Sequence, residues 1–175
     1  NLDRLAKGGT LFTQFYVNGS VCSPSRSAFF TSQFPARNRV HGHFSQPDLN
    51  TSRSMPQFLP PAVPNVAATL KQAGYATAHV GKWHLGLGGR GGPDWNGEIK
   101  PGPLEVGFDY CFMQPSTGDR VPCVYVENHR VVGLDSKDPI KVSYRQKIGD
   151  EPTGKENPGL LKQALRAGHE GTIID

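Results

Sequence analysis

Apolar residues at helical spacing mark the helices expected in this chain. Leu2, Leu5 and Ala6 share one face of a short N-terminal segment that Gly8–Gly9 should end. The stretch Ser25–Gln33 holds no glycine or proline and carries an Ala-Phe-Phe run, which predicts a short buried helix that opens just past a proline.

A third helix and a strand follow one another in the middle of the chain. Asn65 is a favourable N-cap for a helix over 66–73, and Gly74 suits the position after its end. The run Tyr75–Val80 then predicts a strand that stops at Gly81. Helix, glycine turn and strand in this order are typical of an α/β fold, where functional groups gather beyond the carboxyl ends of the strands.

Further strands are expected on either side of this unit. Leu11–Val17 is rich in β-branched and aromatic residues and predicts a strand, so residue 22 would lie at a strand-to-helix junction. Residues 121–132 are consistent with a strand pair or an extended segment. Glycine, proline and polar residues predict loops over 35–64, 86–107 and 135–158.

The C-terminal part carries one more helical segment. Leu160–Arg166 predicts a short helix with Gly168 behind it, and residues 171–175 indicate the start of another element. No second apolar core is visible along the chain. Because the chain also begins without a methionine or a targeting segment, we expect both of its ends to lie inside a longer protein.

Composition narrows the class of protein. The chain has 175 residues, enough for about one domain, and glycine (21) and proline (15) predict a globular protein rich in loops. No stretch approaches the roughly 20 apolar residues of a membrane span, and no repeats at a fixed period occur. The net charge of +4 is spread along the chain without basic blocks, so nothing favours nucleic acid as a partner.

Three cysteines leave two arrangements open. Cys22, Cys111 and Cys123 are too few for a disulfide framework, and no CxxC pair indicates zinc. Cys111 and Cys123 could pair in an exported protein, or both could be buried free thiols.

Two motifs carry the strongest chemical signal. Residues 22–26 read Cys-Ser-Pro-Ser-Arg, and residues 74–86 read Gly-Tyr-Ala-Thr-Ala-His-Val-Gly-Lys-Trp-His-Leu-Gly. The first closely resembles the sulfatase signature C-x-P-S-R, and the second resembles the sulfatase signature G-Y-x-T-x-x-x-G-K-W-H-L-G. Residues 1–6 and 107–110 also resemble segments of this family. The chain is therefore identified as a member of the type I, formylglycine-dependent sulfatases of the alkaline phosphatase superfamily.

The resemblance implies roles for four residues. Cys22 would be oxidised to formylglycine, whose hydrated aldehyde has one hydroxyl to attack sulfur and a second that lets sulfate leave. Arg26 would hold this diol, and Lys82 would bind a sulfate oxygen. His84, two residues on in an extended segment, would face the same side and act as the base, while Trp83 would point into the core.

Other histidines are weaker candidates. His41 and His43 lie in a loop that could face the site, although we expect a structural or solvent-exposed role for both. His79 has the opposite strand parity to Lys82 and should be a core or interface residue with satisfied hydrogen bonds. Many sulfatases supply another substrate-contacting histidine downstream, and His129 is the nearest candidate.

The resemblance also implies an alkaline-phosphatase-like α/β fold with a mostly parallel sheet covered by helices. Residues 1–175 would be part of the N-terminal catalytic domain. The family binds calcium through an acidic pair, the formylglycine and a distant Asp-Asn pair, and only residue 22 can be named here as a ligand. A divalent cation needs several oxygen ligands, so we expect the first metal-binding loop and a C-terminal subdomain to lie outside the chain.

The sequence thus predicts hydrolysis of sulfate monoesters of a small molecule or carbohydrate, with release of inorganic sulfate. Two alternatives stay open: a phosphonate or phosphodiester hydrolase of the same superfamily, and a non-catalytic fragment or pseudoenzyme. The resemblance further implies a formylglycine-generating maturation enzyme as a partner and a periplasmic, secreted or lysosomal location. We expect the 175 residues alone to be inactive.

Overall fold

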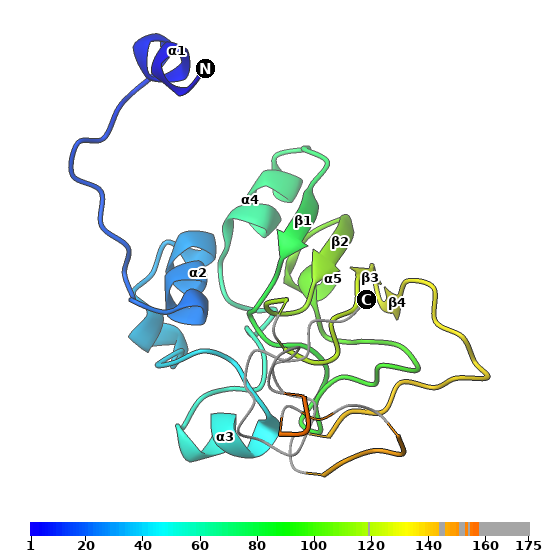
Figure 1. Cartoon of the computed structure of the whole chain (residues 1–175). Coiled ribbons are helices and arrows are strands. Elements are labelled where there is room, and N and C mark those ends of the chain that lie inside the picture. Colours follow the sequence, from blue (N-terminus) through cyan, green and yellow to red (C-terminus); the bar gives the residue numbers. More distant parts are fainter. Residues whose placement is uncertain (119, 144–145, 151–152, 154, 158–175) are drawn as a thin grey trace.

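A computed structural model of the chain describes residues 1–118, 120–143, 146–150, 153 and 155–157 (Figure 1). Its helices are α1 (Leu2–Gly8), α2 (Cys22–Thr31), α3 (Pro47–Ser52), α4 (Val66–Gln72) and α5 (Pro103–Val106), with a 3₁₀ helix, η1, at Pro35–Asn38. The strands are β1 (Ala78–Lys82), β2 (Tyr110–Gln114), β3 (Val126–Glu127) and β4 (Arg130–Val131). The helix expected over Leu160–Arg166 and the element expected at 171–175 lie outside the described residues.

The four strands form one mixed sheet in the order β1-β2-β3-β4. β1 and β2 are parallel, whereas β2 pairs with β3, and β3 with β4, in the antiparallel sense. The main-chain N–H groups of Trp83 and His84 donate to the carbonyls of Gln114 (2.9 Å) and Pro115 (3.0 Å), so the contact between the two parallel segments continues past the end of β1. The α/β class is confirmed, and in the described part the sheet has one parallel pair and two antiparallel pairs.

Aromatic residues anchor α2 on the sheet. Trp83 is buried, and its indole N–H donates to the carbonyl of Gly86 at 2.8 Å. The ring of Phe30, on α2, lies 5.6 Å from the ring of Trp83 and 5.8 Å from that of Phe108, measured between centroids. The prediction that Trp83 points into the core is therefore confirmed, and α2 is fixed relative to β1 by apolar packing.

The helix signals in the sequence are largely confirmed. Asn65 caps α4, because its side-chain oxygen accepts from the main-chain N–H of Ala68 at 3.0 Å. Gly74 follows this helix with a φ of +87°, which suits glycine. α2 begins at Cys22 instead of just past Pro24, since proline fits the first turn of a helix, where its missing N–H costs no hydrogen bond.

Other expectations were wrong in detail. Leu11–Val17 forms no strand: its large apolar side chains are exposed, and it runs from α1 to α2 away from the sheet (Figure 1). A strand needs a neighbour for its main-chain groups, and no described strand pairs with this segment. β2 was not predicted, and β1 begins three residues later than expected. The loops expected over 35–64 and 86–107 contain η1, α3 and α5, all opened by prolines.

A long loop joins β1 to α5, and it is closed at its base. The main-chain N–H of Gly88 donates to the carbonyl of Pro101 at 2.9 Å. Gly86 pairs with Phe58 in an isolated bridge and has a φ of +79°. A Cβ there would lie 2.3 Å from the carbonyl oxygen of Gln57, so only glycine fits. The segments around 58 and 86 are thereby held together.

The remaining expectations concern the hairpin and the membrane. The strand pair allowed for in 121–132 is present as β3 and β4. Within the described part of the chain, no helix combines the length and the apolar character that crossing a bilayer requires.

Candidate active site

Arg26 fastens α2 to the end of β1. Its Nε donates to the carbonyl of Trp83 at 2.6 Å, and its Nη2 donates to the carbonyl of Lys82. The guanidinium also lies over the ring of Phe30, 5.8 Å from its centroid. Burial lowers the pKa of Arg26, and the nearby Cys22 acts in the opposite direction. Cys22 lies one helical turn before Arg26 and therefore on the same face of α2.

Ser23 joins three segments at the same point. Its hydroxyl donates to the carbonyl of His84 at 2.7 Å and accepts from the main-chain N–H of Phe44 at 3.0 Å. The side chain is fully buried, so both hydrogen bonds are made away from solvent. The first turn of α2, the loop at 44 and the segment after β1 are thus held in a fixed relation.

His84 is buried, and its two ring nitrogens have different surroundings. Nε2 lies 3.2 Å from the carbonyl of Phe44, which can only accept, so Nε2 carries the proton. Nδ1 is buried and has no hydrogen-bond partner among the described residues. Burial, followed by the charge of Lys82, lowers the pKa of His84 to about 4, although the Phe44 carbonyl opposes this. The imidazole is therefore neutral at pH 7, with Nδ1 free to accept a proton.

The backbone conformation at His84 differs from the expected extended one. Its φ is +52°, a left-handed conformation, so the chain is no longer extended at this residue and strand parity does not place it beside Lys82. Lys82 is half-buried, and its charge contributes to the lowered pKa of His84. Cys22, Arg26, Lys82 and His84 all lie where the N-terminus of α2 meets the carboxyl end of β1.

A cleft of about 1000 Å³ opens beside His84. Its wall includes His43, Arg53, Gln57 and Trp95. Cys22, Arg26 and Lys82 do not line this cleft, so His84 is the member of the predicted set that connects the junction to it. Among these residues, only His43 was expected from the sequence to lie in a loop that could face the site. The length of the 86–107 loop was a second signal, since long loops in compact domains are often functional.

His41 and His43 differ in position. His41 is exposed, as expected, but His43 lines the cleft, and its ring centroid lies 6.3 Å from that of His84.

His79 is buried against Phe30, Trp83 and Phe108, which confirms a core position. Its Nε2 has no hydrogen-bond partner among the described residues, so the expectation of a satisfied histidine was wrong for this atom. Burial, and then the charge of Arg26, lowers the pKa of His79.

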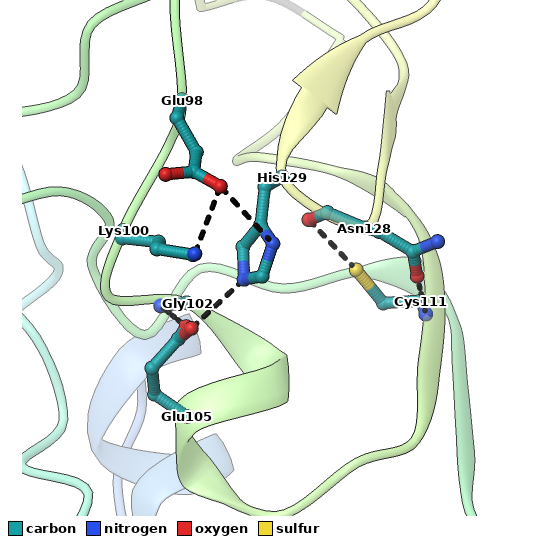
Figure 2. A network of polar contacts seen from close by, with 7 residues as sticks. All are labelled: Glu98, Lys100, Gly102, Glu105, Cys111, Asn128 and His129. Atoms are coloured by element: carbon teal, nitrogen blue, oxygen red, sulfur yellow. Dashed lines mark hydrogen bonds and ion pairs between the residues drawn. The ribbon is translucent and has the colours of Figure 1, made fainter.

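His129 lies in a separate polar network (Figure 2). Its Nε2 is 2.8 Å from Glu105, and its Nδ1 is 4.0 Å from Glu98, which also pairs with Lys100 at 2.8 Å. These contacts hold the turn between β3 and β4 against α5 and the loop before it. No described contact joins His129 to His84, so a role in the candidate site has no support.

Of the two arrangements left open for Cys111 and Cys123, the structure shows free thiols, and Cys22 is free as well. Cys111 is buried, and its thiol donates to the carbonyl of Asn128 at 3.3 Å (Figure 2). Burial raises the pKa of Cys111 to about 11. Cys123 is half-buried, with its sulfur 3.0 Å from the carbonyls of Gly118 and Arg120. Each sulfur thus contacts main-chain oxygens.

Calcium does not fit the described residues on their own. They contain no group of three or more His, Cys, Asp or Glu side chains that could hold a metal ion. Calcium takes six to eight oxygen ligands, whereas Arg26 and Lys82, the charged members of the predicted set, are cations.

Comparison with known proteins decides the family. The family model described as Sulfatase matches residues 1–140. The chain belongs to the sulfatase family. It is 47% identical over 175 residues to N-acetylgalactosamine-6-O-sulfatase of Bacteroides thetaiotaomicron, which covers 100% of this chain and 33% of that sulfatase. Over 123 residues it is 44% identical to human arylsulfatase A, covering 70% of this chain and 22% of that sulfatase.

A solved sulfatase structure shares the fold. It comes from work on the metabolism of multiple glycosaminoglycans by Bacteroides thetaiotaomicron and matches with a TM-score of 0.80 at 41% identity. The match covers 99% of this chain and 38% of the solved chain. The sulfatase chain described here therefore spans between about a fifth and two fifths of the length of these relatives.

Proposed function

We propose that this chain is part of the catalytic domain of a sulfatase that hydrolyses sulfate monoesters and releases inorganic sulfate. The observation that carries the proposal is the meeting of Cys22, Arg26, Lys82 and His84 at one junction, in a chain of the sulfatase family. The relatives named above are all sulfatases, which favours sulfate esters over phosphonates or phosphodiesters.

Each residue has a distinct proposed task. Formylglycine made from Cys22 supplies a hydrated aldehyde, with one hydroxyl for attack on sulfur and another that lets sulfate leave. Lys82 presents a compact cation to a sulfate oxygen, where it stabilises the charge that develops during transfer. His84 accepts a proton at Nδ1, because Nε2 is committed to the carbonyl of Phe44. Arg26 is a positioning residue, since two of its donors hold the main chain of Lys82 and Trp83.

The cleft and the family both support a sulfated carbohydrate as the substrate class. Trp95 offers an aromatic ring and Arg53 a guanidinium, and this mixture suits a sulfated carbohydrate. The Bacteroides relative is named for action on N-acetylgalactosamine sulfate. Family membership supports calcium bound in part by residue 22, maturation by a formylglycine-generating enzyme, and an extracytoplasmic location.

The test uses the full-length protein co-expressed with a formylglycine-generating enzyme. Peptide mass spectrometry should find residue 22 lighter than cysteine by the change of thiol to aldehyde, and Cys22→Ala should abolish sulfate release from an aryl sulfate. Cys123→Ala is the matched control and should keep the activity. Turnover by the Cys22 variant, or faster hydrolysis of a phosphonate monoester than of any sulfate ester, would contradict the proposal.

A further inference from the structure

Arg53 places a cation with unused hydrogen-bond donors in the wall of the cleft. It is the C-cap residue of α3, it is half-buried, and it lines the same cleft as His84. Its Nη1 donates to the carbonyl of His43 at 3.2 Å, and this is the one hydrogen bond that its guanidinium makes with the described residues. No ion pair joins Arg53 to an acidic side chain in the part of the chain that the structure describes.

The unused donors of Arg53 are open to solvent. In the described part of the chain, two buried side-chain nitrogen atoms lack a hydrogen-bond partner, and both belong to histidines. Nε and Nη2 of Arg53 also lack a partner there, so they are not buried. Arg26, in contrast, uses the same two atoms to hold main-chain carbonyls. Because Arg53 lines the cleft, its Nε and Nη2 are available to a molecule bound there.

The guanidinium of Arg53 is held in a fixed relation to the proposed base. Its acceptor is the carbonyl of His43, and the next residue along the chain is Phe44. The N–H of Phe44 donates to the hydroxyl of Ser23 at 3.0 Å, and the carbonyl of Phe44 lies 3.2 Å from Nε2 of His84. An anion that binds Arg53 therefore meets a cation that needs little further ordering.

The cleft has an excess of positive charge and room for a large substrate. Its described wall contains two arginines, Arg53 and Arg120, and one acidic residue, Asp48. Its volume of about 1000 Å³ is at the upper end of the range for small-molecule sites, so a substrate larger than one sugar ring can fit. Charge and size both favour an acidic saccharide in the cleft.

We propose that Arg53 is a specificity-determining residue that binds a second anionic group of the substrate, a carboxylate or a sulfate other than the one released, and this inference rests on the proposed function. A guanidinium presents paired N–H donors that match two oxygens of a carboxylate or of a sulfate. The released sulfate is assigned to Lys82, which lies outside the cleft wall, so the two cations serve different parts of the substrate. Arg53 therefore selects saccharides with two or more anionic groups over those with one.

The experiment compares three substrates in the matured full-length protein. N-acetylgalactosamine 6-sulfate carries one anionic group, its 4,6-disulfate carries a second sulfate, and a disaccharide of the 6-sulfate with a uronic acid carries a carboxylate. Arg53→Met should raise KM for one or both of the doubly charged substrates by about 10-fold to 100-fold, the usual effect of losing a charge-assisted hydrogen bond. Their kcat should change little, because the lost contact does not involve the sulfate that is released. The substrate whose KM rises identifies the second anion as a sulfate or a carboxylate.

Two further variants serve as controls. Arg53→Lys keeps the charge but loses the paired donors, so it should restore part of the lost affinity for the doubly charged substrates. Arg39→Met removes the charge of an exposed arginine that does not line the cleft, and it should leave KM unchanged for all three substrates.

A purely structural role of Arg53 would give a different result. If Arg53 only supports the main chain at 43–44, and through it His84, Arg53→Met should lower kcat for all three substrates equally, and this result overturns the inference. An unchanged KM for both doubly charged substrates also overturns it, as does a wild type that cleaves 4-nitrophenyl sulfate and none of the three sugars. A wild type that cleaves no sulfate ester contradicts the proposed function itself.

Discussion

At the scale of single residues, His84 combines an unusual backbone with an unusual electrostatic setting. A left-handed conformation outside glycine costs roughly 1–2 kcal/mol, and it persists here because the main chain is hydrogen-bonded on both sides, to Pro115 and to Ser23. The same burial that encloses the ring favours its neutral form. The His84 imidazole thus stays unprotonated in mildly acidic conditions.

The pH dependence of turnover should show this property. A base that serves the elimination step must be neutral to accept a proton, so kcat of the matured protein should fall on the acid side with a midpoint near pH 4, and not near 6.5. Because the charge of Lys82 contributes to the low pKa, Lys82→Met should move this midpoint to higher pH while lowering the rate. Measurement of kcat from pH 3 to 8 checks both points, and a wild-type midpoint near 6.5 would show that His84 is not the titrating base.

Lys82 and His84 should also differ in the step that they serve. Lys82→Ala should slow the first step by roughly 10²-fold to 10³-fold, the usual cost of one lost transition-state donor. His84→Ala should let the first step proceed once and then stall, since no group removes the proton that resets residue 22. Rapid mixing with an aryl sulfate should show a burst of about one equivalent of phenol only in the His84 variant. The same slow, burst-free release in both variants would contradict this division of tasks.

At the scale of elements, the junction of α2 with the end of β1 depends on a few buried polar contacts. Arg26 reaches 56 and 57 residues along the chain to the two carbonyls that it holds. Ser23 reaches 61 residues to His84 and 21 residues to Phe44. The helix therefore takes its place from long-range hydrogen bonds as well as from the packing of Phe30.

Removing the Ser23 hydroxyl should loosen this junction. Ser23→Ala leaves the N–H of Phe44 and the carbonyl of His84 without their buried partner, which should cost about 1–3 kcal/mol in the free energy of unfolding. Ser25→Ala is the control on the same helix, because the Ser25 side chain makes no hydrogen bond with the described residues. Urea denaturation followed by fluorescence should separate the two variants, and equal midpoints would mean that the Ser23 hydroxyl contributes little.

Elements could be predicted where local chemistry decides them. Asn65 and Gly74 mark the ends of α4 because a cap and a left-handed residue are local features. β2 lacks such signals: its sequence Tyr-Cys-Phe-Met-Gln gains its strand form by pairing with β1. The opposite holds for Leu11–Val17, which has strand propensity but no pairing partner among the described residues.

The same difference between local and long-range features applies to the candidate site. The two motifs could be found because each is contiguous in sequence. The cleft wall could not, since His43, Arg53 and Trp95 come from separate loops that only the fold brings together. His43 in particular has no neighbours in sequence that distinguish it from His41.

At the scale of the whole molecule, the fold buries the thiols of Cys111 and Cys123 to different degrees. Cys111 lies in the core strand β2, where burial suppresses ionisation, whereas Cys123 lies in the partly exposed loop before β3. In the native protein Cys111 should react with a thiol reagent at least about 100-fold more slowly than in urea, because two pKa units lower the thiolate fraction by that factor. Mass spectrometry under non-reducing conditions should find no disulfide between Cys111 and Cys123, and recovery of a linked peptide would contradict the free state of both.

The loop between β1 and α5 has a consequence for how substrate preference can change. It contributes Gly91, Pro93 and Trp95 to the cleft, yet its base is closed by the hydrogen bond from Gly88 to Pro101. The tip of this loop can therefore be replaced without disturbing the pairing of β1 with β2 or the residues around Cys22. Exchanging residues 89–98 for the equivalent loop of a relative should therefore change the wall of the cleft, and with it the substrate preference. The residues at the junction of α2 and β1 would stay the same.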